Sequence, residues 1–452
     1  MSGETIAAIS TPIGEGGIGI VRLSGPAAVD IADLVFLSPK GLRLADAQTH
    51  TIHYGHVVED GRRIDEVLAS LMRAPRTYTR EDVVEFGCHG GIVAARAVLD
   101  AVLARGARLA ERGEFTKRAY LNGRLSLDQA QAVADIVHAQ TRLGLEAAVD
   151  RLGGRFSQQV AALHADLAAI LADLEVEIDF PDLEVIVEEL RPRVEAVEAR
   201  AVDLLARSER GALVREGLTV AILGRPNVGK STLLNALLAE ERSIVTPIPG
   251  TTRDTVEEVA AIGGVPVRLI DTAGLRVPTD PIEAEGVRRT KEATKRSDLV
   301  LLMLDRSEPL TDEDRALIAT DWGVPALLVL NKSDLAPRIG DVPRGTSIGR
   351  VEIAAKEGQN LAALSDRLVE LLLGGELPSR NTILLLDTWE RDLLRRLRDS
   401  VTRTLDGMSE GRTPDMIAEE LRSAYAASGA LQGVDVAESI LDAIFARFCV
   451  GK

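Results

Sequence analysis

The spacing of hydrophobic residues changes twice along this chain of 452 residues. Up to about residue 118, short β-prone runs such as "TIAAIS", "GIGIVRLSG" and "DVVEFGCHG" alternate with turn residues, a pattern typical of strands joined by tight loops. The run "GIVAARAVLDAVLARG" has helical spacing and ends at a glycine. The first part of the chain is therefore expected to be an α/β domain.

Helical spacing dominates from about residue 119 to 213. One helix is expected over "SLDQAQAVADIVHAQT", with Ser126 as its N-cap. A long helix, "SQQVAALHADLAAILADLEVEI", is expected to end before Pro181, which lacks a backbone N–H group. Another should run from about Leu183 to Gly211, with an interruption or kink near Pro192.

The third pattern begins after Gly217 with the buried strand "LTVAILG", and strands then alternate with helices to about residue 375. The rest of the chain has helical spacing. Helical segments on both sides of an α/β block predict that this block is inserted into one helical domain. We expect a multidomain α/β plus all-α fold: an α/β domain (1–118), a helical domain in two parts (119–213 and 377–452) and an inserted α/β domain (214–376).

Composition narrows the class of protein. The net charge of −16 argues against a uniformly basic nucleic-acid-binding protein. Aromatic residues make up only 3% of the chain, so the cores must be built from aliphatic side chains. The two cysteines, Cys88 and Cys449, lie far apart and argue against a disulfide framework or a zinc site. No apolar run approaches the ~20 residues of a membrane span, and no leader pattern opens the chain, so a soluble cytoplasmic protein is expected.

A phosphate-binding loop follows the strand "LTVAILG" directly. The motif "GRPNVGKS" has Gly224, Gly229, Lys230 and Ser231 at the P-loop spacing. Backbone N–H groups of such a loop wrap phosphate oxygens, and the following helix presents its positive end. Lys230 is expected to reach the outer phosphates and Ser231 to bind Mg²⁺.

Three later motifs indicate that the nucleotide is GTP. "DTAGL" begins at Asp271, which is expected to face the Mg²⁺ ion, and Gly274 can donate its N–H to the γ-phosphate. In "NKSD" (331–334), Asp334 can accept two N–H groups of guanine, which adenine does not offer, while Asn331 and Lys332 brace the base. "IAAKEG" (353–358) stands where a last base-contacting loop belongs.

The residues assigned to GTP binding are Gly224, Asn227, Val228, Gly229, Lys230, Ser231, Thr232, Thr246, Pro247, Ile248, Pro249, Gly250, Thr251, Thr252, Asp271, Thr272, Ala273, Gly274, Asn331, Lys332, Asp334, Ala354, Ala355 and Lys356. The block resembles the translation-factor-related GTPases. Leu275 stands where Ras-like GTPases carry a glutamine that orients the attacking water. Two candidates remain for that work: the segment 243–254, in which Thr252 is expected to bind Mg²⁺, and Asn227, whose side-chain oxygen can bind a monovalent cation.

Taken together, these motifs and several others resemble the MnmE (TrmE) family, the GTPases of tRNA wobble-uridine modification. The resemblance extends over nearly the whole chain and rests on "TPIGEGGIGIVRLSG", "EDVVEFGCHGG", "RGEFTKRAYLNGRLSLDQAQAVADIV", "IDFP", the GTPase block and the terminal "FCVGK". It implies an N-terminal domain that resembles folate-binding domains and drives homodimerisation. It also implies a formyl-tetrahydrofolate as carbon source, and a flavoprotein partner, MnmG (GidA), in a heterotetramer that adds an aminomethyl-type group to carbon 5 of uridine 34.

The resemblance also assigns individual residues. The folate positions are Arg22, Glu85, Arg124 and Lys452. Arg124 replaces the more common lysine and changes a point cation into a planar fork, so its contact geometry is not carried over. The potassium positions are Asn227, Thr246, Ile248 and Thr251, and the water-activating glutamate is Glu283. Potassium-dependent dimerisation of the GTPase domains is implied as well.

Cys449 receives a catalytic role from the resemblance, whereas helical periodicity alone favours inert packing. The sequence leaves open whether the thiol attacks uridine, attacks a one-carbon intermediate, or only builds the site. Helical spacing of Ile440, Leu441, Ile444, Phe445 and Phe448 predicts a helix docked on the helical domain. That helix would point Cys449 and Lys452 at the folate pocket.

Some of the residues singled out here have a structural interpretation beside the functional one. Cys88 is expected to be a packed small side chain, and His89 is either a turn residue or a ligand contact. The arginines Arg391, Arg395, Arg396, Arg398 and Arg403 are either a tRNA-binding patch or a solvated helix face. Two other functions remain: a GTP-switched ribosome-assembly factor, which would need an RNA-binding appendage that we do not find, and a folate scaffold with a vestigial GTPase, which the intact motifs disfavour.

Overall fold

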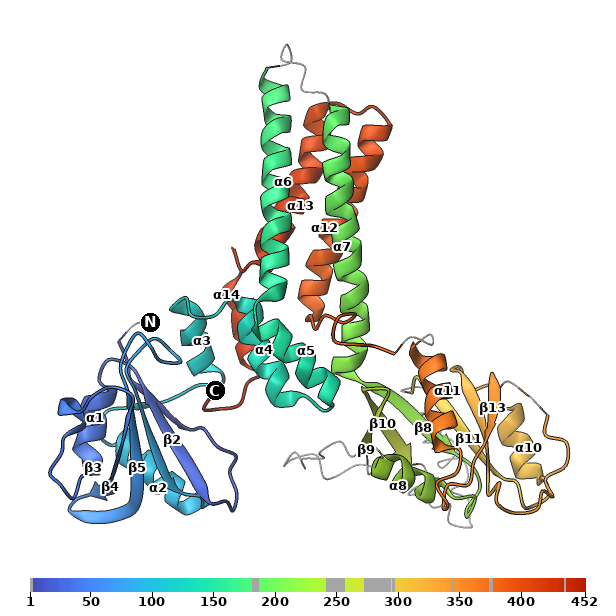
Figure 1. Cartoon of the computed structure of the whole chain (residues 1–452), viewed down its shortest axis with the longest axis horizontal. Coiled ribbons are helices and arrows are strands. Elements are labelled where there is room, and N and C mark those ends of the chain that lie inside the picture. The colour runs from blue at the N-terminus through green and yellow to red at the C-terminus, as the bar shows by residue number, and fades with distance from the viewer. Residues whose placement is uncertain are drawn as a thin grey trace, which may run out of the picture. The chain divides into compact units, whose positions relative to one another are not determined.

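The computed structural model describes residues 3–180, 187–240, 257–271, 294, 297–343, 345, 347–373, 377–434 and 436–452 (Figure 1). The chain forms two compact units, each built from separate segments. Unit 1 comprises Met1–Ala134, Arg151–Val185 and Thr413–Lys452. Unit 2 comprises Asp135–Asp150 and Ile186–Arg412. The three domain boundaries expected from the sequence, after residues 118, 213 and 376, stay a prediction.

Unit 1 contains a seven-stranded sheet in the order β3-β4-β5-β6-β2-β1-β7. β1 and β7 are parallel, and the other neighbours are antiparallel. The strands are β1 (Ile6–Ile9), β2 (Ile18–Ser24), β3 (Phe36–Leu37), β4 (Thr51–Glu59), β5 (Arg62–Met72), β6 (Val83–His89) and β7 (Arg108–Leu109).

One face of this sheet is buried beneath α1 (Ala28–Val35) and α2 (Ile92–Leu103). Val21, Leu23 and Phe86 belong to the shared core. Because side chains alternate across a strand, Arg22 and Glu85 lie on the opposite face. There α3 (Glu114–Leu121) packs Phe115 against Ile6 and Ala8 of β1, but several large apolar side chains remain exposed: Ile18, Ile52, Tyr54 and Leu68.

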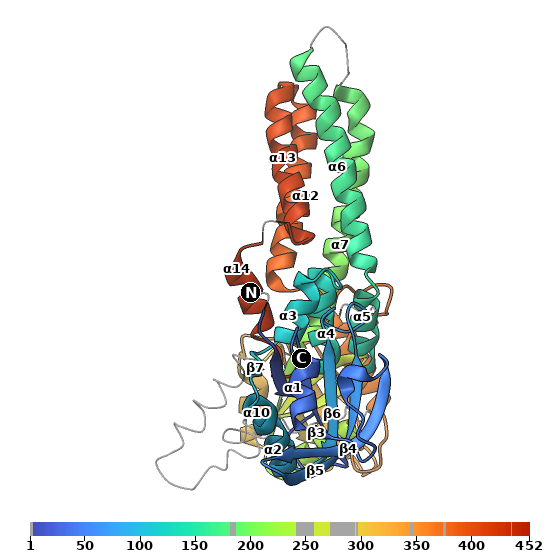
Figure 2. The same ribbon diagram turned by 90° about the vertical axis from the view of Figure 1, so that its left-hand side faces the viewer.

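The helices α4 (Leu127–His138), α5 (Arg142–Leu152), α6 (Arg155–Asp179), α13 (Pro414–Leu431) and α14 (Glu438–Phe445) complete the helical part of unit 1, although the end of α4 and most of α5 fall in unit 2. α4 begins directly after Ser126, as predicted, and the Gln129 side chain accepts the backbone N–H of Ser126 at 3.0 Å. α6 ends before Pro181, also as predicted. α6 and α13 run side by side in both views (Figures 1 and 2), and His164 stacks on Tyr425 at 4.1 Å.

In unit 2, α7 (Val187–Glu216) packs along α12 (Thr388–Ser409) (Figure 1). The helix continues through Pro192, so an interruption there is wrong, whereas the alternative of a kink stays a prediction; Pro192 lies in the second turn, where only one preceding intrahelical bond is lost. The predicted end at Gly211 is also wrong. A Cβ there would lie 2.0 Å from the Leu384 carbonyl oxygen, so the glycine allows close packing rather than ending the helix.

The second sheet has six strands in the order β13-β12-β11-β8-β10-β9. All neighbours are parallel except β9 and β10. The strands are β8 (Leu218–Leu223), β9 (Glu257–Ile262), β10 (Val265–Asp271), β11 (Leu299–Asp305), β12 (Ala326–Asn331) and β13 (Gly349–Glu352), with helices α8 (Lys230–Glu240), α10 (Asp312–Ala319) and α11 (Leu361–Leu373).

Both faces of this sheet are covered. Val220 and Ile222 of β8 contribute to one core, and Ala221 and Leu223 to the other, which explains the unbroken apolar run in the sequence. The strand order reverses at β8, and ligands of such sheets bind at the carboxyl ends of the strands near that point. In the described part of the chain, no helix combines the length and apolarity needed to cross a membrane.

Candidate functional site

The P-loop connects the end of β8 to α8, as expected. Gly224 and Gly229 have φ angles of +151° and +103°, which L side chains rarely adopt. A Cβ at Gly224 would lie 2.4 Å from the Met303 carbonyl oxygen, and one at Gly229 would lie 2.2 Å from Nδ2 of Asn331. Both positions therefore require glycine, and the loop they form fits a phosphate group.

Lys230 lies inside this loop and is 7% exposed. Its ammonium group donates to the carbonyl oxygens of Gly224 and Arg225 at 2.7 and 2.9 Å. Ser231 and Thr232 follow in the first turn of α8, where both are exposed. Lys230, Ser231 and Thr232, three of the residues that the sequence assigned to GTP and Mg²⁺, thus lie together at the positive end of one helix.

The guanine motif is tied to the P-loop through Asn331. Its Nδ2 donates to the carbonyl oxygen of Val228 at 2.7 Å, and its Oδ1 accepts the backbone N–H of Ala355 at 3.0 Å. One side chain therefore joins the phosphate loop, the NKSD loop and the loop of Ala354 to Lys356. Asp334 is exposed, and its carboxylate has no hydrogen-bond partner among the described residues.

Lys332 pairs with Asp305 at the end of β11, at a distance of 2.5 Å. Asp305 is buried. Burial raises the pKa of its carboxyl, but hydrogen bonds from Lys332 and Ser307 outweigh that effect, and the pKa lies below its ordinary value. A buried carboxylate thus stays charged beside the base-binding loop. The sequence analysis did not find Asp305, because no motif at the end of "LVLLML" marks it.

Part of the expected site lies outside the described residues: Thr246, Pro247, Ile248, Pro249, Gly250, Thr251, Thr252, Thr272, Ala273, Gly274, Leu275 and Glu283. The backbone of Asp271 is described. It closes β10 and lies opposite Ile222 of β8, next to the strand that leads into the P-loop.

On the sheet of unit 1, the structure brings Arg22 and Glu85 together. They are cross-strand neighbours on β2 and β6, and Arg22 Nε donates to the Glu85 carboxylate at 2.7 Å. Nη1 of Arg22 also donates to the carbonyl oxygen of Gly451 at 3.4 Å, and the guanidinium lies 5.5 Å from the centre of the Phe115 ring. Arg22 therefore joins Glu85 to the C-terminal tail.

Arg124 joins this group through Tyr78. Its guanidinium lies 4.9 Å from the centre of the Tyr78 ring and donates to the Thr77 carbonyl oxygen at 3.2 Å. Burial raises the pKa of the Tyr78 phenol, although a hydrogen bond with Thr116 and the positive charges of Arg124 and Arg22 oppose the shift. Sequence reasoning missed Tyr78, since it lies in a loop without periodicity.

The C-terminal tail is ordered against the N-terminal domain. Gly113 donates its N–H to the Cys449 carbonyl oxygen at 3.4 Å, and Val450 forms an antiparallel bridge with Arg112. Gly451 has φ +94°, and a Cβ there would lie 2.2 Å from the Ile9 carbonyl oxygen. Lys452 follows directly, so the fourth predicted folate residue lies next to the carbonyl that Arg22 binds. The Cys449 thiol is free and the residue is exposed.

The last helix is docked by part of its predicted apolar face. Ile444, Phe445 and Phe448 are buried, but Ile440 is 36% exposed. Phe445 packs against Tyr120 at the end of α3, with ring centres 6.4 Å apart, and Tyr120 lies at the start of the segment 119–213 that was expected to be helical. The tail reaches the sheet because α3 is itself packed on β1.

The arginines of α12 are interleaved with acids. Arg391 pairs with Glu216, Arg395 with Asp392 and Glu209, and Arg398 with Asp399. These ion pairs reduce the positive character that the sequence suggested for this helix face.

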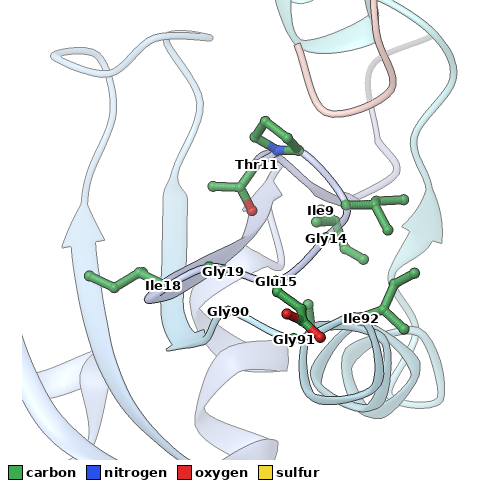
Figure 3. Close-up of a pocket in the computed structure, with 13 residues that line it drawn as sticks. Ile9, Thr11, Gly14, Glu15, Ile18, Gly19, Gly90, Gly91 and Ile92 are labelled. Atoms are coloured by element: carbon green, nitrogen blue, oxygen red, sulfur yellow. The ribbon is translucent and has the colours of Figure 1, made fainter. Parts of the chain in front are cut away.

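A separate cavity of about 280 Å³ lies at the edge of the unit 1 sheet (Figure 3). The loop from Thr11 to Gly16 arches over the start of α2, and Glu15 lies beside Gly91 and Ile92. The Gly16 N–H donates to the Gly90 carbonyl oxygen at 2.7 Å and holds the loop there. None of the four predicted folate residues lines this cavity.

Comparison with known proteins decides the family. The model of the MnmE helical domain matches residues 127–449, and that of the GTP-binding protein TrmE N-terminus matches residues 5–124. The tRNA modification GTPase MnmE of Geobacillus kaustophilus is 46% identical, with 99% of each chain covered. Those of Heliobacterium modesticaldum and Bacillus subtilis are 45% and 43% identical, again over at least 99% of each chain.

The chain belongs to the MnmE family. The predicted resemblance is confirmed, as is the multidomain α/β plus helical architecture. MnmE membership, the P-loop and the NKSD motif make this protein a GTP-binding GTPase of tRNA modification.

Solved structures align with part of the chain. The Era GTPase of Aquifex aeolicus is 29% identical and covers 40% of this chain and 66% of its own, with a TM-score of 0.27. The G domain of the FeoB iron transporter of T. maritima is 25% identical and covers 34% of this chain and 98% of its own, with a TM-score of 0.25.

Proposed function

We propose that this protein uses GTP hydrolysis to control the addition of an aminomethyl-type group to carbon 5 of the tRNA wobble uridine (U34). A formyl-tetrahydrofolate supplies the carbon, and the flavoprotein MnmG acts as the partner in a cytoplasmic heterotetramer. The proposal rests on one observation above others: Arg22, Glu85, Arg124 and the C-terminal tail meet on one sheet face in a chain that also carries a complete P-loop.

At the GTP site, the residues have separate tasks. The P-loop N–H groups and Lys230 hold the β- and γ-phosphates, and Asp334 accepts N–H groups of guanine. Ser231, together with Thr252, holds Mg²⁺, which neutralises charge on the phosphates when bound. The free carboxylate of Asp334 and the two glycine positions that exclude a Cβ support this assignment.

At the folate site, the chemistry of the donors suits the ligand. Glu85 offers a carboxylate to the paired N–H donors of a pterin ring, while the hydrogen bond from Arg22 holds that carboxylate in place. Tyr78 and Phe115 provide aromatic surface beside Arg124 and Arg22. Lys452 is placed to pair with a folate carboxylate or carbonyl, and Cys449 lies three residues before it, within reach of the one-carbon unit.

Two features of the proposal concern assembly. The exposed apolar face of the unit 1 sheet, with Ile18, Ile52, Tyr54 and Leu68, supports homodimerisation through the N-terminal domain. For the GTPase domains, we propose dimerisation that depends on potassium bound by Asn227, Thr246, Ile248 and Thr251, with Glu283 activating the water.

Mass spectrometry of wobble uridines tests the function directly. Cells that lack this gene should lose the carbon-5 side chain on U34, and the wild-type gene should restore it. A variant with Arg22→Ala should fail to restore it although its GTP hydrolysis is retained. Normal U34 in the deletion strain together with a ribosomal subunit defect would instead favour the ribosome-assembly alternative.

A further inference from the structure

The segment that follows β11 holds the loop that carries Asp334. β11 and β12 are parallel neighbours, and Asp305 lies opposite Asn331 in their register. The backbone N–H of Arg306 donates to the Asn331 carbonyl oxygen at 2.9 Å. The NKSD loop therefore leaves its strand already bonded to the residue after β11.

The Arg306 side chain then brackets Asp334. Its Nη1 donates to the carbonyl oxygens of Ser333 and Leu335, each at 3.2 Å. These are the residues immediately before and after Asp334. A single guanidinium fixes the peptide groups on both sides of the base-binding carboxylate, a task for which its planar set of donors is suited.

Arg306 is itself anchored from the other side. Its Nε lies 3.2 Å from the Glu352 carboxylate, and Glu352 ends β13 just before the loop of Ala354 to Lys356. The guanidinium is only 22% exposed. It therefore links the NKSD loop with the second loop expected to contact the base.

The neighbouring pair Asp305–Lys332 acts on the same loop. Lys332 has φ +62°, an uncommon conformation for a residue with a side chain, and its ammonium is held by the buried Asp305 carboxylate. Asp305, the last residue of β11, and Arg306, which follows it, thus restrain Asn331, Lys332, Ser333 and Leu335.

We infer that Arg306 is a positioning residue for guanine recognition: without touching the nucleotide, it sets the orientation of Asp334 through the carbonyl groups on either side. The inference rests on the assignment of Asp334 as the guanine acceptor. Guanine offers Asp334 two donors, its ring N–H and its exocyclic amino group, whereas hypoxanthine offers only the first. A misplaced carboxylate therefore costs GDP more affinity than IDP.

The test measures the affinities of the full-length protein for GDP and IDP by calorimetry at fixed Mg²⁺ and salt. Arg306→Ala should weaken GDP binding by about tenfold, the size expected for lost charge-assisted hydrogen bonds, and should weaken IDP binding less. The preference for GDP over IDP should therefore shrink. Arg306→Lys keeps the positive charge but not the planar set of donors. Its preference for GDP over IDP should lie between those of the wild type and Arg306→Ala.

Arg350→Ala is the matched control, because Arg350 faces the same Glu352 but contacts no residue of the NKSD loop. It should leave both affinities unchanged. Equal losses of GDP and IDP affinity in Arg306→Ala would show a merely structural role and overturn the inference, as would an unchanged GDP affinity.

The variant Asp334→Asn tests the premise that Asp334 binds guanine separately from the inference that Arg306 positions it. This variant should lose GDP affinity and accept xanthine nucleotides, because the amide inverts one donor–acceptor pair. Adding Arg306→Ala to it should cost less GDP affinity than in the wild type, since both changes remove the same contact. Full additivity would contradict action through Asp334. Wild-type GDP affinity in Asp334→Asn would refute the guanine assignment and the inference with it.

Discussion

In the nucleotide site of this protein, the Asn331 side chain connects two loops as well as standing in the base-binding motif. The Asn331 amide donates to the P-loop carbonyl of Val228 and accepts from the N–H of Ala355. Motif spacing alone predicts that this residue braces the base. That it also fastens the phosphate loop follows only from the parallel arrangement of β8, β11 and β12, which brings these loops to one edge of the sheet.

At the residue scale, the pair of Asp65 and His89 also predicts that the stability of the fold depends on pH. Asp65 accepts hydrogen bonds from Nδ1 and the backbone N–H of His89 at 2.6 and 2.8 Å. The hydrogen bond and the charge of Asp65 raise the pKa of His89 above 6.5. Burial raises the pKa of Asp65, but the bonds from His89 prevail and hold that pKa below 3.8.

The two pKa shifts predict the pH range in which the pair stabilises the fold. The contribution of His89 is complete below pH 6.5 and is lost as the pH rises through its raised pKa, and that of Asp65 is lost as the pH falls through its lowered pKa. His89→Gln should therefore lower the melting temperature most near about pH 5 and least in alkaline solution. Thermal unfolding across this range checks it; a pH-independent difference would exclude the ion pair as the cause.

At the scale of elements, the end of α7 is a junction of charges. Arg215 pairs with Asp135 of α4 and with Asp387, the N-cap of α12. Both carboxylates are only 5% exposed. Glu216 next to it pairs with Arg391, so three helices of unit 2 are held together just before β8 begins.

Removing Arg215 should be costly. Arg215→Ala leaves two buried carboxylates without their cation and should reduce the free energy of unfolding by about 3 kcal/mol. Arg142→Ala removes a solvent-exposed pair with Glu146 and should change the free energy of unfolding by less than about 1 kcal/mol. Chemical denaturation of the two variants measures the difference, and equal stability would mean that the junction contributes little.

The C-terminal tail is an element without regular secondary structure, and its position depends on one glycine. Deleting Cys449–Lys452 should leave GTP hydrolysis almost intact and abolish uridine modification. Gly451→Ala should have a similar effect, because its Cβ would clash with the Ile9 carbonyl. Wobble-uridine mass spectrometry and phosphate release distinguish the two activities. Normal modification by the truncated protein would make the tail dispensable.

At the scale of the whole molecule, the P-loop and the residues proposed to bind folate lie in different parts of the chain. The α/β block that carries the P-loop belongs to unit 2, and the proposed folate residues belong to unit 1. Both units are assembled from segments separated in sequence, so neither is a simple continuous domain. A change in the state of the GTPase therefore acts on a chain that passes repeatedly between the two units.

Hydrolysis should depend on potassium. Leu275 cannot orient a water molecule, so the proposed cation at Asn227 must supply the charge stabilisation that an arginine finger provides elsewhere. Turnover should be high in potassium and low in sodium, and Glu283→Ala should lose turnover while keeping nucleotide affinity. Equal rates in both salts would refute the cation, and a large loss of affinity would make Glu283 structural.

The sequence by itself predicted the chemical motifs of this protein more fully than it predicted how the helices and strands pack. The P-loop, NKSD and the terminal "FCVGK" depend on residue type and local spacing, and local spacing also placed the start of α4 and the end of α6. The same local rules failed at Gly211, where α7 continues while it packs against the segment before α12.

Tertiary structure alone decided which distant residues meet. Arg22, Tyr78, Arg124 and Gly451 come from four separate segments, and only the pairing of strands and the packing of α3 bring them to one sheet face. Arg306 carries no motif, and its contacts arise because β11, β12 and β13 are adjacent in the sheet. Periodicity records which face of an element is buried, whereas it contains no information on the partner that buries it.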